Sequence, residues 1–293
     1  MELTRQLGRS LRGWFDTGAT PNFQAQGTRI DWLRVAPFVA MHLACLAVFW
    51  VGVSASAVAV AAALYALRAF ALTAFYHRCF SHRAFRTSRA VQFVFALLGA
   101  SAAQRGPLWW ASHHRHHHAQ ADRPEDVHSA SRHGFAWSHA GWFLAPANFH
   151  VRLERVRDLT RFPELRFLDR FDVLPPLALA LGLWLAGGAQ LLVWGFFVST
   201  VALYHATFAI NSLAHRFGSR RYATPDDSRN NFWLALIALG EGWHNNHHHY
   251  PRAARQGFNW WEVDFTWYGL RLLAALGLIW DLRPVPARIR ERR

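Results

Sequence analysis

Two long apolar stretches dominate the hydrophobic pattern of the chain. The first runs from Ala36 to Leu67 and the second from Val173 to His215, and neither contains an Asp, Glu, Lys or Arg. Each stretch is too long for one membrane helix, because a bilayer core about 30 Å thick needs about 20 apolar residues. A short flexible break, "GVSAS" in the first and "AGGAQ" in the second, interrupts each stretch. The pattern predicts two helical hairpins, with helices over about 36–53, 55–76, 173–187 and 189–212.

The polar segments before, between and after the hairpins carry nearly all of the arginines, whereas the hairpin tips are uncharged. By the positive-inside rule, these segments lie together in the cytoplasm, with both termini. We therefore expect an all-α, multi-pass integral membrane protein with four transmembrane helices and a cytosolic helical cap. The expected parts are an N-terminal cytosolic or interfacial segment (1–35), two transmembrane hairpins (36–76 and 173–214), and a cap in two parts (77–172 and 215–293, the latter with a basic tail).

Two shorter apolar stretches lie within the expected cap. Val91 to Ala103 is too short to span a bilayer, and Trp267 to Trp280 is interrupted by Arg271. We expect both to form helices that pack on the cap or lie at the membrane interface.

The composition supports a membrane protein over a nucleic-acid-binding one. The formal net charge is +14, yet 52% of the residues are hydrophobic, so apolar and basic residues must be segregated. A basic chain binds either nucleic acid or an anionic membrane surface, and the long apolar stretches favour the membrane. The two cysteines, Cys45 and Cys79, form neither a CxxC motif nor a disulfide framework. The first 30 residues contain arginines but no apolar core of a cleavable signal peptide, and they suggest a weak amphipathic segment on the membrane surface.

Histidines gather in four short motifs, "HRCFSH", "HHRHHH", "NSLAH" and "HNNHHH". In the second and fourth motifs, three histidines at i, i+3 and i+4 share one helix face, and so do Asn211 and His215 at i and i+4. His77 and His82, at i and i+5, would fall about 140° apart on a straight helix. We expect them to lie at a distorted helix end or to serve two metals.

The predicted topology brings the four motifs together. The second and fourth membrane helices end at "HRCFSH" and "NSLAH", so both motifs emerge on the side that carries the other two. Nine imidazoles are too many for one ion and suitable for two, although imidazole alone leaves iron, zinc, copper and nickel open. The nine candidate metal ligands are His77, His82, His114, His117, His118, His215, His244, His247 and His248.

The four motifs, in this order and with this spacing, resemble the signature of membrane fatty-acid desaturases over about residues 36–265. The acyl-CoA (stearoyl-CoA, delta-nine) type is the most similar, and the plain chain resembles a bacterial member, which implies the bacterial inner membrane. The resemblance implies a di-iron centre held by the nine histidines, with Asn211 reaching one iron through a water. His113, His116 and His249 exceed the family pattern and are expected to be neighbours of ligands, with a register error between His248 and His249 left open.

The resemblance also implies the reaction and its partners. Two iron ions and O2 would remove two hydrogens from a long saturated acyl chain, carried on CoA, on a carrier protein or in a lipid. No haem or flavin pattern is visible, so a separate donor, a ferredoxin or a b-type cytochrome with a reductase, must supply the electrons. Membrane lipids are further partners. A lipid hydroxylase and a non-catalytic membrane metal-binding protein are the alternative functions.

Several further residues are candidates for roles around the centre. Metal-bound histidines commonly donate their second N–H to a carboxylate, and Asp126 and Glu241 are the candidates. For Asp122, a solvated loop charge is nearly as good an explanation. Trp110 matches a substrate-contacting tryptophan of the acyl-CoA enzymes. Arg105 occupies a position where those enzymes have a shorter polar residue. This difference argues against recognition of the CoA group in the same way. The arginines of 152–171 could bind CoA phosphates. Attraction of a basic juxtamembrane segment to anionic lipid would explain them without any substrate.

Overall fold

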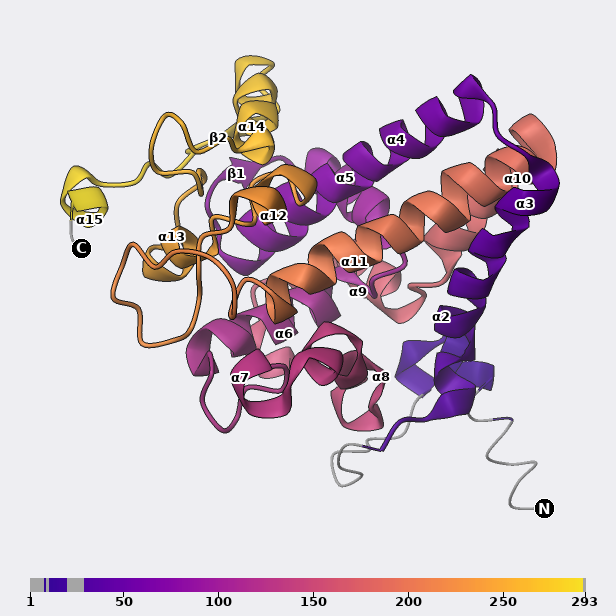
Figure 1. Ribbon diagram of the computed structural model, residues 1–293, viewed down its shortest axis with the longest axis horizontal. Coiled ribbons are helices and arrows are strands. Elements are labelled where there is room, and N and C mark those ends of the chain that lie inside the picture. The colour runs from indigo at the N-terminus through magenta and orange to yellow at the C-terminus, as the bar shows by residue number, and fades with distance from the viewer. Residues whose placement is uncertain (1–7, 9–10, 20–28, 292–293) are drawn as a thin grey trace.

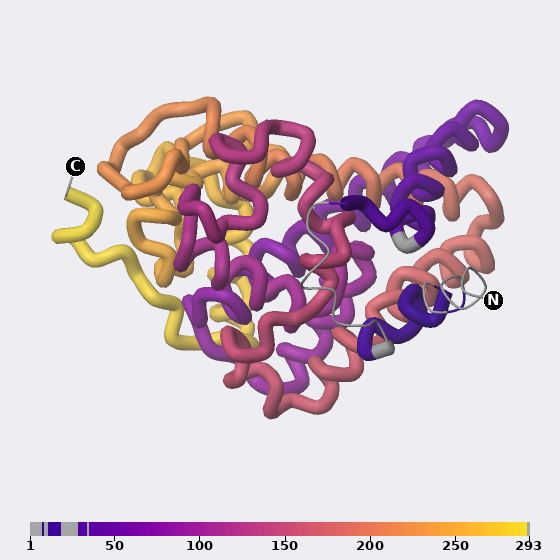
Figure 2. The backbone as a smooth tube through the Cα atoms, turned by 90° about the horizontal axis from the view of Figure 1, so that it is seen from below, coloured from indigo at the N-terminus to yellow at the C-terminus, as the bar shows by residue number. Residues whose placement is uncertain are grey.

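The structure is a computed structural model that describes residues 8, 11–19 and 29–291. The expected amphipathic segment at the N-terminus lies mostly outside these residues. Figure 1 shows long helices that project to one side, and a region of short helices and loops on the other side, where α6, α7, α12 and α13 gather. The tube view in Figure 2 shows the same division along the longest axis.

The first predicted hairpin is present. Helix α2 (Trp32–Ala44) continues through the 3-10 turn η2 (Cys45–Ala47) into α3 (Val48–Val51). Helix α4 (Ala55–Phe70) then runs back and continues as the π-helical segment η3 (Ala71–Ser81). Between them, Gly52 adopts a φ of +69°, and the Ser54 hydroxyl caps α4 by accepting a hydrogen bond from the Ala57 N–H (3.2 Å). The chain therefore turns within "GVSAS", as predicted.

The second hairpin turns at a pair of glycines. Helix α10 (Leu174–Leu191), the π-helical segment η7 (Leu192–Val198) and α11 (Ser199–Ser212) follow one another directly. Within α10, however, Gly187 (φ −159°, ψ 26°) and Gly188 (φ 61°, ψ −154°) are not helical. The conformation of Gly188 is essentially restricted to glycine. The break falls inside "AGGAQ", as predicted.

The expectation of four membrane-spanning helices is not confirmed. Among the described residues, two helices are long and apolar enough to cross a bilayer, Ala55–Ser81 and Leu174–Ser212, and the second includes the break at Gly187 and Gly188. The apolar helix over Val35–Val51 is shorter than these two.

Polar side chains join the two hairpins. At the tips, the Ser54 hydroxyl donates to Gln190 Oε1 (2.7 Å), and the Gln190 amide donates to the Val51 carbonyl (2.9 Å). Deeper in the bundle, the buried Arg68 guanidinium donates to Thr200 Oγ1 (2.6 Å) and to the Ser199 hydroxyl. Because an unpaired polar group in an apolar interior is costly, these bonds favour one relative position of the hairpins.

Most of the remaining elements gather around the ends of the hairpins that lie away from their tips, where η3 and α11 end. Helix α5 and the histidine-bearing helix α6 pack against η3, and their shared core contains Leu72, Phe75, Tyr76 and Phe80. The elements are η1 (Thr17–Ala19), α5 (Arg89–Ala100), α6 (Pro107–Gln120), α7 (Ala130–His133), η4 (Trp137–Gly141), α8 (Trp142–Leu144), η5 (Pro146–Asn148), η6 (Leu153–Arg155), α9 (Pro163–Arg170), α12 (Phe232–Ile237), α13 (His244–His249), α14 (Phe265–Ala275) and α15 (Ala287–Glu291).

Two details correct the all-α expectation. Residues Arg86–Thr87 (β1) and Ile279–Trp280 (β2) form a short antiparallel pair, with Arg86 opposite Trp280. The helix expected over 267–280 accordingly ends early, because α14 stops at Ala275 and Gly277 takes a φ of +70°. The helix expected over 91–103 is present as α5.

Candidate metal centre

Side chains from four separate segments meet where the hairpins enter the region of short helices. The segment η3 and the residue after it supply His77 and His82, and His215 follows the end of α11. Helices α6 and α13 supply the other six predicted histidines. The nine fall into two sets, in each of which the ligating atoms lie within 4.8 Å of one another. The first histidine group is His77, His82, His114, His118 and His247, and the second histidine group is His117, His215, His244 and His248.

The π-helical segment explains how His77 and His82 share a group. In a π-helix the backbone hydrogen bonds join residues five apart, and the His82 N–H donates to the His77 carbonyl (3.2 Å). The two imidazole rings therefore lie close, with centroids 4.9 Å apart. Of the two explanations that the sequence left open, the distorted helix end agrees with the structure.

The start of α6 is fixed by its neighbour α9. Asp169 Oδ1 accepts the Trp109 N–H (2.8 Å), which satisfies a free donor in the first turn of α6. This contact requires the glycine at 106, because a Cβ there would lie 2.3 Å from the Asp169 Cα. The contact with α9 therefore fixes where α6 begins, and with it the positions of His114, His117 and His118 along the helix.

The three additional histidines lie outside both groups. His113 Nε2 bonds to the His150 carbonyl (3.1 Å), and His116 Nε2 bonds to the Glu125 carbonyl (2.8 Å). His249 stacks on the Tyr222 ring at 4.0 Å, and its Nε2 bonds to the Ile289 carbonyl (3.1 Å). His248, and not His249, therefore points into the second histidine group.

Buried amides that the sequence analysis did not single out hold α13 in place. Asn245 Oδ1 accepts the backbone N–H groups of Arg221 and Tyr222, both at 2.8 Å. The Asn246 amide donates to Glu262 Oε2 (3.0 Å) and to the Gln256 carbonyl (3.0 Å). Both asparagines are fully buried. Their position between histidines in "HNNHHH" could have indicated that both amides are buried beside the metal ligands and hydrogen-bonded there, because buried polar groups need partners.

The spacing of the imidazole nitrogens fits metal coordination. Nε2 of His247 lies 3.0 Å from that of His77 and 2.9 Å from that of His118, yet one N–H could serve only one of them. In the second histidine group, Nε2 of His215 and His244 are 3.0 Å apart. Nitrogens bound to one ion at about 2.1 Å and at right angles would be separated by about 3 Å. The donor sets therefore fit two metal ions, one in each group.

Carboxylates orient four of the nine imidazoles through Nδ1, which leaves Nε2 facing inward. His77 pairs with Glu241, and His117 pairs with Asp126 (2.9 Å). These are the two carboxylates that the sequence offered as candidates. His215 pairs with Asp122 (2.9 Å) and His248 with Asp226 (2.9 Å). The sequence left Asp122 undecided and did not indicate Asp226. Asp126 also lies 3.5 Å from His128, which is outside both groups.

Burial sets the protonation of the centre. Burial first, and then the neighbouring imidazoles, holds the pKa values of His114, His118 and His247 well below the usual range. These rings are thus neutral, which is the form that binds metals. Burial alone would raise the pKa of Asp122, but the hydrogen bond and charge of His215 lower it well below its ordinary value. The donors at these three positions are therefore neutral, and the Asp122 carboxylate is ionised. At His117, burial is outweighed by the charge and hydrogen bond of Asp126, which raise the pKa of that imidazole.

A second buried network lies behind His77. The Arg78 guanidinium donates to Glu241 Oε1 (3.1 Å) and to both carboxylate oxygens of Asp264 (2.9 and 3.0 Å). Asp264 also caps α14 by accepting the Trp267 N–H (2.9 Å). The network connects η3, the loop before α13 and the start of α14. Nothing in the sequence pattern indicated Arg78 or Asp264.

An apolar cavity of about 700 Å³ leads to the histidine groups. Its wall includes His77, His114, His117 and His244 at the inner end, together with Asn211. Trp110, the candidate substrate-contacting residue, lines the cavity and stacks on the His114 ring with centroids 5.0 Å apart. The volume lies within the range of about 300–1,000 Å³ that is typical of ligand pockets. Trp260 and Trp261 are exposed and do not line it.

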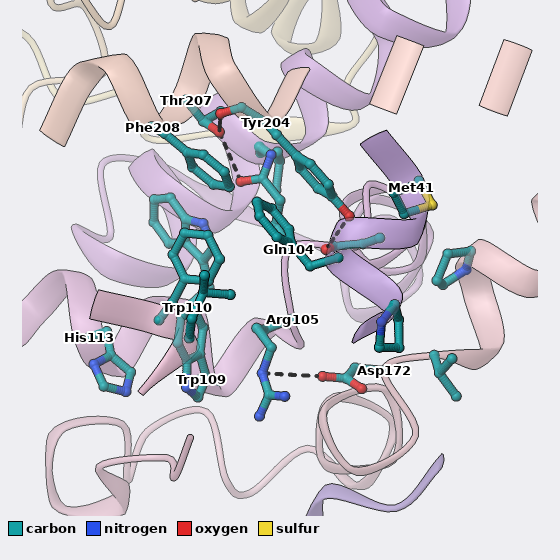
Figure 3. Close-up of a pocket in the computed structure, with 18 of the residues that line it drawn as sticks. Met41, Gln104, Arg105, Trp109, Trp110, His113, Asp172, Tyr204, Thr207 and Phe208 are labelled. Atoms are coloured by element: carbon teal, nitrogen blue, oxygen red, sulfur yellow. Dashed lines mark hydrogen bonds and ion pairs between the residues drawn. The ribbon is translucent and has the colours of Figure 1, made fainter. Parts of the chain in front are cut away.

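Beside the imidazoles, the cavity wall carries further polar side chains (Figure 3). The Thr207 hydroxyl donates to Gln104 Oε1 (3.0 Å), and the Tyr204 hydroxyl donates to the Ala103 carbonyl (3.0 Å). Arg105 Nε lies 3.5 Å from Asp172 Oδ2, and its Nη2 donates to the Phe149 carbonyl (2.9 Å). Arg105 thus faces a carboxylate and does not present an uncompensated positive charge.

Comparison with known proteins identifies relatives along most of the chain. Residues 54–279 match the model of the fatty acid desaturase family. The chain is 38% identical over 258 residues to an sn-1 stearoyl-lipid 9-desaturase of Anabaena variabilis, covering 87% of this chain and 94% of that protein. It is 37% identical to an sn-1 stearoyl-lipid 9-desaturase of Synechocystis, covering 96% of this chain and 90% of that protein.

A plant relative acts on a different carrier. The icosanoyl-CoA 5-desaturase of Limnanthes douglasii is 42% identical over 203 residues, which cover 68% of this chain and 57% of that protein. The relatives therefore include desaturases named for lipid-bound and for CoA-bound acyl groups. Together with the family match over most of the sequence, they establish that this chain belongs to the fatty acid desaturase family.

Proposed function

We propose that this protein is an O2-dependent desaturase that introduces a cis double bond into a long saturated acyl chain, at the delta-nine position. The observation that carries the proposal is an apolar cavity that ends at two groups of converging imidazole nitrogens. Family membership and the two 9-desaturase relatives support the reaction and the position. The acyl group would arrive on CoA, as the sequence resemblance suggested, or in a membrane lipid.

The nine histidines would hold two iron ions, with Asn211 contributing to one of them through a water. The iron pair, when bound, supplies the oxidising power that no side chain has for removing hydrogen from an unactivated methylene. The net reaction converts –CH2–CH2–, O2, two electrons and two protons into –CH=CH– and two waters. A separate ferredoxin, or a b-type cytochrome with its reductase, would supply the electrons.

The remaining roles belong to the protein. The carboxylates paired with Nδ1 fix ring orientation, and the metal affinity of such sites typically depends on these partners. The wall formed by Trp110, Tyr204 and Phe208 excludes water and gives the acyl chain a fixed path past the histidine groups. Positioning of this kind determines which carbons lie near the metals.

We further propose four membrane-spanning helices in the two hairpins, with the segments 1–35, 77–172 and 215–293 on the cytoplasmic side of a bacterial inner membrane. The reversals at Gly52 and Gly188 support this arrangement, since each divides an apolar stretch into two antiparallel helices. Shorter helices can be accommodated by local thinning of the bilayer.

Two other functions make different predictions. A lipid hydroxylase would share the metal centre but add one oxygen atom to the acyl chain. A non-catalytic metal-binding protein would need no cavity, and the apolar cavity beside the histidine groups argues against it.

The proposal is tested by expression in a host that lacks unsaturated fatty acids, followed by mass spectrometry of the acyl chains. We expect acyl chains that have lost two hydrogen atoms. The His118→Ala variant should abolish this product, whereas His249→Ala, which changes a histidine outside both groups, should retain it. A gain of one oxygen atom would establish the hydroxylase, and full activity of His118→Ala would contradict the metal assignment.

A further inference from the structure

The cavity reaches the outer surface of the hairpins. Three residues of α10 line the cavity and are also about half exposed: Leu177 (49%), Leu181 (54%) and Trp184 (55%). They lie at i, i+4 and i+7, so they form one stripe along the helix. A side chain that touches both the cavity and the outside marks an opening between them. The cavity is therefore accessible from the side of the hairpins.

The opposite edge of this opening is α2. Pro37, Phe38 and Met41 of α2 line the cavity, and Pro37 is exposed. Helix α10 approaches the first hairpin near its tip, where it contacts α3. Gly13 and Trp14, from the described part of the N-terminal segment, line the cavity as well. We call this opening, rimmed by Pro37, Leu177, Leu181 and Trp184, the side portal.

The chemistry of the side portal suits the bilayer. Its rim is apolar, and three of its four residues lie on α10, which belongs to one of the two helices long and apolar enough to cross a membrane. The hydrocarbon core of a bilayer therefore surrounds the rim of the inserted protein. An acyl chain that is attached to a glycerolipid can enter sideways, because its polar headgroup then stays at the membrane surface and need not be desolvated.

The cavity lacks the charges that a CoA group needs. Among its described lining residues, Arg105 is the one arginine, and Asp172 lies 3.5 Å from its Nε. The sequence contains no lysine. Phosphate groups are typically held by several charge-assisted hydrogen bonds from cationic side chains. The described lining of the cavity therefore offers no cluster of cations for the phosphates of CoA.

We propose that the acyl chain of a membrane glycerolipid enters the cavity through the side portal between α2 and α10. The proposal rests on the proposed desaturase function and specifies its substrate class and route. It assigns to Leu177, Leu181 and Trp184 the role of an entrance, and to the bilayer the role of substrate reservoir.

The test compares two alanines of α10. Ala180 lines the cavity, whereas Ala178 is exposed on the same helix and does not. Purified Ala180→Trp and Ala178→Trp proteins are placed in vesicles that contain a phospholipid with a photoactivatable diazirine in its sn-1 acyl chain. Cross-linked peptides around Trp110, which stacks on His114 deep in the cavity, are then quantified by mass spectrometry. This measurement does not depend on bound iron or on turnover.

We expect deep labelling in the wild type and in Ala178→Trp, and a loss of about tenfold in Ala180→Trp, because a large ring overfills the entrance. Met41→Trp, on the opposite edge, should give the same loss and guards against a folding defect in one variant. Equal deep labelling in Ala178→Trp and Ala180→Trp would overturn the side portal. Deep labelling by a diazirine acyl-CoA, and none by the phospholipid, would overturn it as well.

The two proposals fail separately. If the wild type produces no unsaturated chains yet shows portal-dependent labelling, the desaturase function is wrong and the route stands. If the wild type desaturates lipid while labelling is the same in both α10 variants, the function stands and the route is wrong.

Discussion

Carboxylates from distant loops orient imidazoles in both histidine groups. Glu241 and Asp126 could be anticipated, because each lies close in sequence to a histidine motif. Asp226 lies 22 residues before its partner His248 in the chain, and only folding brings the two together. Sequence reasoning therefore identified candidate ligands by their spacing on a helix, but it identified only the carboxylates that stand next to a motif.

The substitution Asp226→Asn should weaken the second histidine group. The Asn side chain cannot hold the Nδ1–H of His248 as a carboxylate does, and the loss of such partners typically lowers metal affinity by about 10- to 100-fold. Ferrous iron titration of the purified protein measures this change. Asp227→Asn is the matched control, because the neighbouring Asp227 carboxylate pairs with no imidazole among the described residues. Equal affinities for the two variants would contradict the assigned role.

At the scale of elements, the hydrophobic pattern predicted the two hairpins and their breaks, but not the π-helical segment η3 or the early end of α14. The breaks at Gly52 and Gly188 were predicted because apolar stretches longer than a bilayer must turn at their flexible residues. The spacing of His77 and His82 suggested a distorted helix end as one of two explanations. Its π-helical form could not be predicted, since it depends on packing in the core with α5 and α6. The early end of α14 reflects a strand pairing with β1 that is distant in sequence.

The turn at Gly188 gives a direct test of the second hairpin. Gly188→Ala should destabilise the protein by about 1–3 kcal/mol, because φ +61° with ψ −154° is strained for any residue with a Cβ. Gly182→Ala, in the regular part of the same helix with open space around it, should be neutral or stabilising. Thermal unfolding in detergent compares the two. A stable Gly188→Ala variant would indicate that the chain does not reverse there.

At the scale of the whole molecule, the hairpin model requires the tips and the histidine region to lie on opposite sides of the membrane. The length and composition of the described helices support two candidate spans, and the four-span arrangement remains a prediction. The sequence predicted convergence of the four motifs from topology alone, because the ends of two membrane helices must emerge on one side. The cavity and its side portal could not be predicted, since they depend on how the helices pack.

Labelling of single cysteines tests this arrangement. In a variant in which Cys45 and Cys79 are replaced by alanine, Ser56→Cys at the tip of the first hairpin should react with a membrane-impermeant maleimide in intact spheroplasts. Arg220→Cys, which is exposed near α13, should react only after the membrane is permeabilised. Reaction of both positions in intact spheroplasts would contradict the proposed topology.

The central claim is that nine imidazoles from four segments form two metal sites. The most direct measurement is the iron content of protein purified anaerobically from iron-supplemented cells. The wild type should contain about two iron ions per chain, and the His215→Ala/His244→Ala variant, which loses half of the second histidine group, should contain about one. A wild type without iron, or a double variant that retains both ions, would contradict the account.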